Sequence, residues 1–149
     1  MDKKFKGTII NSLRKLSYSY PARNNAKKQQ KVAPATFECQ HCGIWIYEGS
    51  KDLEKHKELI SLKKKIPKNG IIKDKSNIDH IDPIIPLEGF QKKTWDWHEY
   101  IENMFCKEEG FQVLCKSCHK KKTDKENQIR LKNRQKNLTN TQKTSKVKK

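Results

Sequence analysis

Hydrophobic residues recur at helical spacing at the start of the chain and again in later segments. Residues 7–20 predict a helix with one apolar face. That face consists of Ile9, Ile10, Leu13, Leu16 and Tyr20. Pro21 is expected to end or kink this helix, because proline disrupts the helical hydrogen bonds around it. A second, basic helix is expected over residues 22–33, before Pro34.

Short apolar runs bounded by turn residues predict strands. Residues 37–39 and 44–47 predict two strands joined by a tight turn, in which Gly43 can adopt a positive φ. Residues 77–83 predict a third strand, which a proline stops, and residues 111–114 predict a fourth. These short strands among helical segments indicate a small α+β protein.

Two further helices are expected in the middle of the chain, the first capped by Ser50 and the second by Thr94. Their apolar positions are Leu53, Leu59, Ile60 and Leu62 in the first, and Trp97, Ile101, Met104 and Phe105 in the second. His56 lies among charged residues of the first helix and is expected to be exposed. Residues 117–134 predict a lysine-rich helix, and residues 135–149 lack periodicity and are expected to be disordered.

Composition limits the size of the core. Of 149 residues, 33% are apolar and 34% charged, so one small domain is expected. Its apolar core would be too small to be stable without an additional cross-link. We divide the chain into a basic helical arm (1–33), a body (34–134) and a disordered tail (135–149). The sequence contains no apolar run of ~20 residues and no signal peptide, so a cytoplasmic location is expected.

The net charge of +17 is concentrated at the two ends of the chain. Residues 1–33 hold nine Lys/Arg and one acidic residue, and residues 120–149 hold twelve and two. Residues 34–119 are nearly neutral, with thirteen basic and fourteen acidic residues. Basic ends on a neutral body favour a nucleic-acid partner over a merely solvated charged surface. The candidate phosphate contacts are Arg14, Lys15, Arg23, Lys27, Lys28, Lys121 and Lys122.

Four of the five cysteines form two CxxC pairs, which indicates a metal site. Cys39 and Cys42 would supply one half of a tetrahedral zinc shell, and Cys115 and Cys118 the other. A redox role for either pair would need a thioredoxin-like pattern, which the sequence lacks. Cys106 is left over and is expected to be a buried, inert thiol.

A carboxylate and two imidazoles are candidates for chemistry near this zinc. Asp79 and His80 are neighbours on the predicted strand, so their side chains diverge. We therefore expect the two side chains to have separate roles: Asp79 binds a hard cation and His80 binds a water. His119 follows the second CxxC pair and opens a helix, so the zinc would fix its position.

At these residues the chain resembles the HNH endonucleases in their zinc-bearing form, of the kind encoded by bacteriophages or mobile elements. The resemblance covers about residues 36–130. The matching segments read F-E-C-Q-H-C-G, I-D-H-I-D-P and Q-V-L-C-K-S-C-H-K-K-K-T. The resemblance implies a ββα-metal fold, in which two strands and a helix surround one divalent ion, and it implies hydrolysis of phosphodiester bonds in DNA.

The resemblance also implies roles for individual residues. His80 would be the general base, and Asp79 and His119 would bind a catalytic Mg²⁺ or Mn²⁺. Duplex DNA would be the substrate, with 5′-phosphate and 3′-hydroxyl products, and a phage packaging or replication protein is a compatible partner. The family has an asparagine that orients the base nine residues before the second ligand, whereas this chain has Gly110 there. A main-chain carbonyl or a neighbouring residue would then have to orient His80.

Two other functions fit parts of the sequence. A non-catalytic, zinc-stabilised nucleic-acid-binding protein would need the four cysteines and the basic ends, but would not need Asp79 and His80 beside them. A scaffold or virion-associated protein would need only the basic ends to hold nucleic acid. The sequence leaves an RNA substrate open as well.

Overall fold

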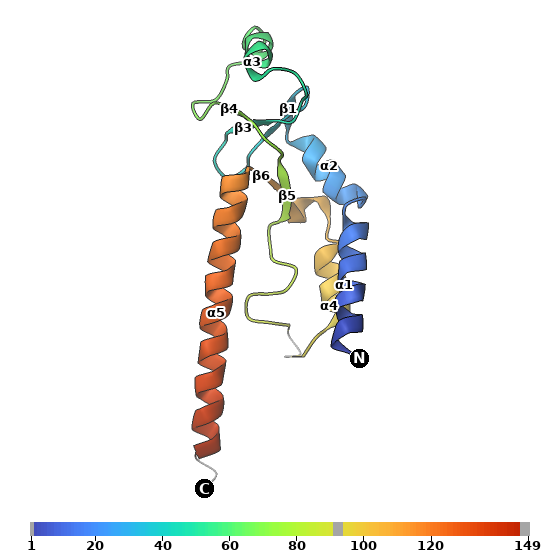
Figure 1. The fold of residues 1–149 in the computed structure, drawn as a ribbon, viewed down its shortest axis with the longest axis vertical. Coiled ribbons are helices and arrows are strands. Elements are labelled where there is room, and N and C mark those ends of the chain that lie inside the picture. The colour runs from blue at the N-terminus through green and yellow to red at the C-terminus, as the bar shows by residue number, and fades with distance from the viewer. Residues whose placement is uncertain (1, 91–93, 147–149) are drawn as a thin grey trace.

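The protein has a small α+β fold, as its sequence predicts (Figure 1). The structure is a computed structural model and describes residues 2–90 and 94–146, with side chains described up to residue 136. In chain order the elements are α1 (Lys3–Ser17), α2 (Pro21–Gln29), β1 (Lys31–Ala33), β2 (Thr36–Glu38), β3 (Trp45–Tyr47), α3 (Leu53–Ser61), β4 (Ile71–Lys73), β5 (Asn77–His80), α4 (Trp97–Met104), the 3-10 turn η1 (Glu108–Gly110), β6 (Phe111–Leu114) and α5 (Lys116–Lys146).

The strands form two separate sheets. The first has the order β1-β2-β3-β4, and its only parallel pair among the described strands is β3 with β4. Helix α3 makes the crossover that such a parallel pair requires. The second sheet pairs β5 with β6 antiparallel, so that His80 lies opposite Phe111 and Asp79 opposite Gln112. β2, β3, β5 and β6 are the four strands that the sequence predicts.

The two sheets divide the molecule along its length (Figure 1). The first sheet and α3 lie at one end, and the second sheet lies in the middle. From there α5 runs along one side, α1 and α4 lie along the other, and the segment after β5 runs between them. The chain ends therefore lie away from the first sheet, and the elements that carry His80 and His119 meet in the middle.

The apolar core consists of three clusters. The first contains Cys39, Ile46, Leu114, Cys115 and Cys118. The second contains Trp45, Tyr47, Ile60 and Ile71, and the third contains Phe90, Tyr100 and Met104. Strand β3 separates the first two clusters, because successive side chains of a strand point to opposite faces. Each cluster is small, so polar contacts have a large share in joining the parts.

The N-terminal helices pack against the body of the protein. Ile10 and Leu13 of α1 contact the third cluster, whereas Leu16 is 59% exposed and lies outside the buried stripe. The hydroxyl of Tyr20 donates to the carbonyl of Phe105 at 3.0 Å. Pro21 begins α2, which lies against β6 and η1 and ends before residues 31–33 form β1 instead of continuing the helix.

Aspartates cap α3 and α4, which corrects the predicted caps Ser50 and Thr94. The carboxylates of Asp52 and Asp96 each accept hydrogen bonds from the backbone N–H groups two and three residues later, at 2.9–3.3 Å. Each aspartate directly precedes the first helical residue, which is where a side-chain oxygen reaches these unpaired donors. The predicted hydroxyl caps lie two residues too early.

His56 is buried, which is the opposite of the exposed position expected from its charged neighbours. Its side chain is 6% exposed and stacks on Tyr47, with the ring centroids 3.6 Å apart. Its Nε2 lies 2.7 Å from the hydroxyl of Thr36, which itself donates to the carbonyl of Pro34. The hydroxyl must therefore accept from Nε2–H, and this fixes the tautomer of the neutral ring.

Helix α5 extends further than the sequence predicts. It runs without a break from Lys116 to Lys146, through most of the expected disordered tail (135–149). Residues 116–146 contain neither glycine nor proline, so no residue in them breaks the helical hydrogen bonds. Loss of apolar periodicity marks the end of a helix only if that helix is stabilised by packing. Helix α5 projects away from the sheets, so its length does not depend on an apolar face (Figure 1).

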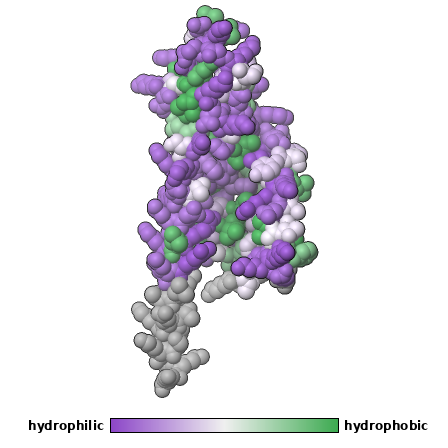
Figure 2. Space-filling view, in the orientation of Figure 1, coloured by the Kyte–Doolittle hydropathy of each residue, from purple (hydrophilic) through white to green (hydrophobic). Residues whose placement is uncertain are grey.

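No helix within residues 2–90 and 94–146 is both long and apolar enough to span a membrane. In Figure 2 the visible face is largely hydrophilic, and its hydrophobic side chains lie in separate patches.

The buried His56 predicts a pH dependence of folding. Burial, and then the charge of Lys51, lower the pKa of His56 below its ordinary value. The unfolded chain therefore takes up a proton near pH ~6.5 that the folded protein resists, so stability is lost as the pH falls below that value. Between about pH 7.5 and about pH 5.5, urea denaturation should show a larger loss of unfolding free energy for wild type than for His56→Gln. Equal losses would contradict this assignment.

Candidate functional site

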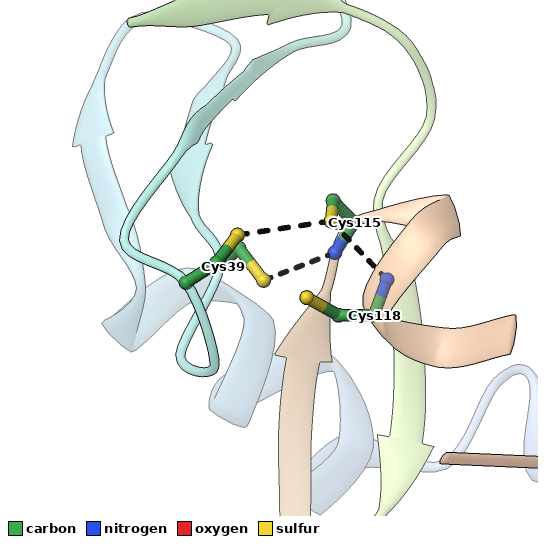
Figure 3. Close-up of side chains that lie close together, drawn as sticks. Cys39, Cys115 and Cys118 are labelled. Carbon is green, nitrogen blue, oxygen red and sulfur yellow. Dashed lines mark hydrogen bonds between the residues drawn. The ribbon is translucent and has the colours of Figure 1, made fainter. Parts of the chain in front are cut away.

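The two CxxC pairs meet at one point between the sheets (Figure 3). Cys39, Cys42, Cys115 and Cys118 place their Sγ atoms within 4.8 Å of one another. The Sγ atoms of Cys42 and Cys115 are 3.9 Å apart. Zinc with four thiolates at ~2.3 Å requires sulfur atoms about 3.8 Å apart, so the distance between Cys42 and Cys115 matches the ion and the four sulfur atoms are near enough to bind one together. The predicted pairing of the two CxxC motifs is confirmed.

Backbone N–H groups donate to two of the sulfur atoms and favour the thiolate form of Cys39. The N–H of Cys115 donates to Sγ of Cys39 at 3.3 Å, and the N–H of Cys118 donates to Sγ of Cys115 at 3.5 Å. Burial raises the pKa of Cys39, but backbone N–H groups including that of Cys115 outweigh it and bring this pKa down to about 7. Burial and the neighbouring thiols raise the pKa of Cys118, as expected where a cation is needed to neutralise the group.

A tight turn and a glutamine bring the first CxxC pair to the second. Gly43 has a φ of 69°, as the sequence predicts for this turn. Gln40 pairs with β6 as if it were a strand residue. Its N–H donates to the carbonyl of Val113 at 2.9 Å, and its side-chain oxygen accepts from the N–H of Val113 at 2.7 Å. The tip of the β2–β3 hairpin is thereby attached to the strand that leads into Cys115.

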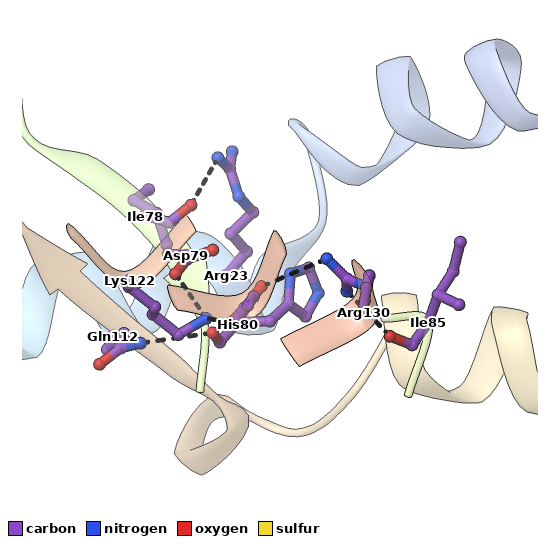
Figure 4. Close-up of polar contacts among 9 residues, drawn as sticks. Arg23, Ile78, Asp79, His80, Ile85, Gln112, Lys122 and Arg130 are labelled. Carbon is purple, nitrogen blue, oxygen red and sulfur yellow. Dashed lines mark hydrogen bonds and ion pairs between the residues drawn. The ribbon is translucent and has the colours of Figure 1, made fainter. Parts of the chain in front are cut away.

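Asp79 and His80 diverge from β5, as expected for neighbours on a strand (Figure 4). Both side chains are half-buried. Asp79 faces α5, and the ring of His80 faces the end of α4 and Phe111. β5, β6 and α5 together form two antiparallel strands followed by a helix, and the cysteine cluster lies at the junction of β6 and α5.

The imidazole of His80 is fixed by a main-chain carbonyl. Its Nε2 lies 3.0 Å from the carbonyl oxygen of Met104, and its ring centroid is 4.7 Å from that of Phe111. Met104 is the last residue of α4, where carbonyls have no partner within the helix. A carbonyl only accepts, so Nε2 carries the proton, and Nδ1 of the neutral ring is the nitrogen able to accept one. Burial lowers the pKa of His80, which favours this neutral form.

The carboxylate of Asp79 is paired with a lysine of α5. Nζ of Lys122 lies 2.9 Å from Oδ2 of Asp79 and 2.5 Å from Oε1 of Glu126. Glu126 also lies 3.8 Å from the guanidinium of Arg130, which donates to the carbonyl of Ile85 at 3.0 Å. These residues alternate in charge at intervals of four along α5, so they share one face of the helix. That face holds both β5 and the segment that follows it.

The predicted phosphate contacts have different surroundings in the structure. Arg23 donates to the carbonyl of Ile78 at 3.2 Å and lies near enough to Asp79 to affect it electrostatically. Lys27 pairs with Glu48 at 2.7 Å, an interaction that attaches α2 to the residue after β3, and Glu48 in turn accepts from the N–H of Ser76 just before β5. Lys122 pairs with Asp79 as described above. The remaining four, Arg14, Lys15, Lys28 and Lys121, are exposed.

His119 lies in the first turn of α5 and is half-buried. It precedes Lys122 by three residues, which places the two on neighbouring positions of the helix surface. Within residues 2–90 and 94–136, the cysteine cluster is the one group of three or more ligating side chains suited to a metal. Neither Asp79 nor His119 therefore belongs to a group of three or more ligating side chains in this part of the chain.

Within residues 2–90 and 94–136 the ring of His80 is held by the carbonyl of Met104 and not by an asparagine. The amide of Asn103 donates to the carbonyl of Ile84 at 3.0 Å and so supports the segment after β5. Asn127 is exposed. A Cβ added to Gly110 would lie 2.5 Å from Sγ of Cys106, so the cysteine occupies the space that a side chain there would need. The glycine and the half-buried Cys106 are thus matched to each other.

The sequence predicts that a main-chain carbonyl or a neighbouring residue orients His80, but it identifies neither Met104 nor the contact of Lys122 with Asp79. The spacing of Lys122, Glu126 and Arg130 could have revealed a ladder of charges along α5. No local signal indicates the carbonyl of Met104 or the role of Gln40, because both contacts join segments that are distant in sequence.

No family model matches the chain, and neither a curated protein nor a solved structure matches it.

The cysteine geometry predicts one tightly bound zinc per chain. Cys39→Ser and Cys115→Ser should lose the metal and unfold, because zinc binding supplies folding free energy to a protein with a small core. Cys106→Ser is the matched control, since Cys106 lies outside the cluster, and it should keep both metal and fold. Elemental analysis and circular dichroism measure the two effects. Folded wild-type protein without zinc would contradict the prediction.

The contact between Gly110 and Cys106 predicts a coupled pair of substitutions. Gly110→Ala should destabilise the fold by about 1–3 kcal/mol, as overpacking usually does. Adding Cys106→Ala should recover part of this loss, because it removes the Sγ contact and leaves only the Cβ contact at 3.1 Å. Urea denaturation of the two single variants and the double variant gives the coupling. Additive effects would show that the two positions do not touch.

Proposed function

We propose that this protein is a metal-dependent endonuclease of the zinc-bearing HNH type, which hydrolyses phosphodiester bonds in duplex DNA. The observation that carries the proposal is the fixed imidazole of His80, whose Nε2 is held by the carbonyl of Met104. It stands on β5 next to a carboxylate that pairs with a cation, and β5 belongs to the unit β5–β6–α5, whose β6–α5 junction carries the cysteine cluster. The ββα-metal fold is the interpretation of this unit that the proposal adopts.

In this proposal His80 is the general base. Its Nδ1 accepts the proton of a water that attacks phosphorus, while Nε2–H remains bonded to Met104. Burial keeps the pKa of His80 below its ordinary value, so the ring is neutral and able to accept at neutral pH. Asp79 and the carbonyl of Met104 act in the opposite direction and stabilise the ring once it is protonated.

Asp79 and His119 are the proposed ligands of a divalent ion. A carboxylate with an imidazole is a donor set that Mg²⁺ or Mn²⁺ tolerates, and the carboxylate already holds the positive charge of Lys122 at 2.9 Å. A bound ion would supply positive charge that offsets the charge developing on the phosphate and on the leaving 3′ oxygen. The cysteine cluster fixes the first turn of α5, and with it His119.

Basic residues near the site suit a polyanionic substrate. The guanidinium of Arg23, anchored on β5 through Ile78, adds a positive charge close to Asp79. Along α5, the exposed Lys121, Lys125 and Lys132 fall within about 40° of one another around the helix axis, so they form a stripe that can follow a phosphate backbone. A stripe of this kind contacts DNA without reading its sequence.

A non-catalytic, zinc-stabilised nucleic-acid-binding protein is the second candidate. The pair between Asp79 and Lys122 favours it, because a neutralised carboxylate has less attraction for a metal ion. Gly110, in place of the expected asparagine, favours it as well. This candidate keeps the cysteine cluster and the basic stripe but assigns no role to the tautomer of His80.

The two candidates differ in what His80→Ala does. The nuclease proposal predicts that this variant keeps zinc, fold and DNA affinity but nicks supercoiled plasmid ~10²–10⁴-fold more slowly, the usual cost of losing a general base. Added Mn²⁺ should not rescue it, whereas it should partly rescue Asp79→Ala and His119→Ala. The control is His98→Ala, whose exposed ring pairs with Glu102 on α4. If wild type and His80→Ala cut equally fast, the second candidate is the better one.

A further inference from the structure

The surroundings of Lys122 raise a question about Asp79 that the nuclease proposal leaves open. Asp79, Lys122 and Glu126 are half-buried, with side chains 21%, 20% and 17% exposed. Lys122 lies between the two carboxylates, at 2.9 Å from Asp79 and 2.5 Å from Glu126. One ammonium group therefore serves both a proposed metal ligand and a second carboxylate one helical turn away.

We infer that Lys122 is an exchangeable cation at Asp79: it occupies the carboxylate until a divalent ion binds there, and it then remains attached to Glu126. The inference rests on the proposed function, because it concerns the same metal site. Both cations need the carboxylate of Asp79, and like charges repel strongly in a half-buried site, where water screens them little. Binding of the ion and contact between Lys122 and Asp79 therefore oppose each other.

Glu126 makes this exchange feasible. It lies four residues after Lys122 on the same helix, so the flexible lysine stem can leave Asp79 and keep its second partner. Glu126 also has a second basic neighbour. Arg130 lies 3.8 Å from it and is itself anchored to the carbonyl of Ile85. The displaced ammonium thus stays charged and paired, within one turn of the site.

The inference assigns opposite effects to two neighbouring residues of α5. Lys122→Gln removes the competing cation and should tighten Mn²⁺ binding to Asp79. Glu126→Gln removes the alternative partner, ties Lys122 to Asp79 and should weaken Mn²⁺ binding. A general electrostatic effect of Glu126 would weaken binding whether or not Lys122 is present, so the double variant separates the two explanations.

The experiment is a titration of the zinc-loaded protein with Mn²⁺, in which electron paramagnetic resonance measures the free ion. Lys122→Gln should bind Mn²⁺ about 5–150-fold more tightly than wild type, the usual range for coupling between two binding events. Lys121→Gln is the matched control, because it removes the same charge from an exposed neighbour, and it should change the affinity by less than about 2-fold. Asp79→Ala identifies the site by losing this binding.

Glu126→Gln should weaken Mn²⁺ binding in the wild-type background and have little effect beside Lys122→Gln. Asp124→Asn is its matched control, since Asp124 is an exposed acidic residue that pairs with Lys120. Equal affinities for Lys122→Gln and Lys121→Gln, or equal effects of Glu126→Gln in both backgrounds, would overturn the inference.

The outcomes also separate this inference from the proposed function. If wild type nicks plasmid and Lys122→Gln binds Mn²⁺ no better than Lys121→Gln, the exchange is wrong and the nuclease proposal stands. If Asp79→Ala leaves Mn²⁺ affinity unchanged and wild type does not nick plasmid, the metal site itself is wrong, and the nuclease proposal fails with it.

Discussion

The meeting of four cysteine sulfur atoms is the interaction on which the arrangement of this protein depends. The sheets consist of strands three or four residues long, and the core is divided into three clusters, so apolar packing alone joins the parts weakly. The cysteine cluster attaches the β2–β3 hairpin to the junction of β6 and α5. The first turn of α5 is thereby fixed against β5, and the side chains of the candidate site follow from that position.

Polar contacts then define the site within this frame. The end of α4 presents a carbonyl to His80 and fixes its tautomer, and one face of α5 presents alternating charges to Asp79 and to the segment after β5. These contacts join the end of α4, the strand β5 with the segment that follows it, and α5. The environment of Asp79 is therefore set by the position of α5, and a change at the cysteine cluster should alter the contact between Lys122 and Asp79.

Much of this protein could be predicted from local sequence patterns. The CxxC spacing, the turn at Gly43 and the period of the strands depend on neighbouring residues, and the structure agrees with them. The burial of His56 and the contact of Lys122 with Asp79 depend on where distant segments meet. A charged neighbourhood in the sequence does not reveal that Tyr47 lies against the histidine ring. The sequence predicts that the last helix ends at residue 134, because no apolar periodicity continues beyond that point. In the structure α5 runs to Lys146 without an apolar face, so this pattern does not indicate the end of the helix.

The chemistry of the cleaved ends tests the central claim most directly. Purified zinc-loaded protein would be incubated with a short DNA duplex and Mn²⁺ in water enriched in ¹⁸O, and the product ends analysed by mass spectrometry. If His80 activates a water for attack on phosphorus, with the 3′ oxygen leaving, the label appears on a 5′-phosphate and the other end is a 3′-hydroxyl. Uncut DNA, or products that end in a 3′-phosphate, would contradict the account.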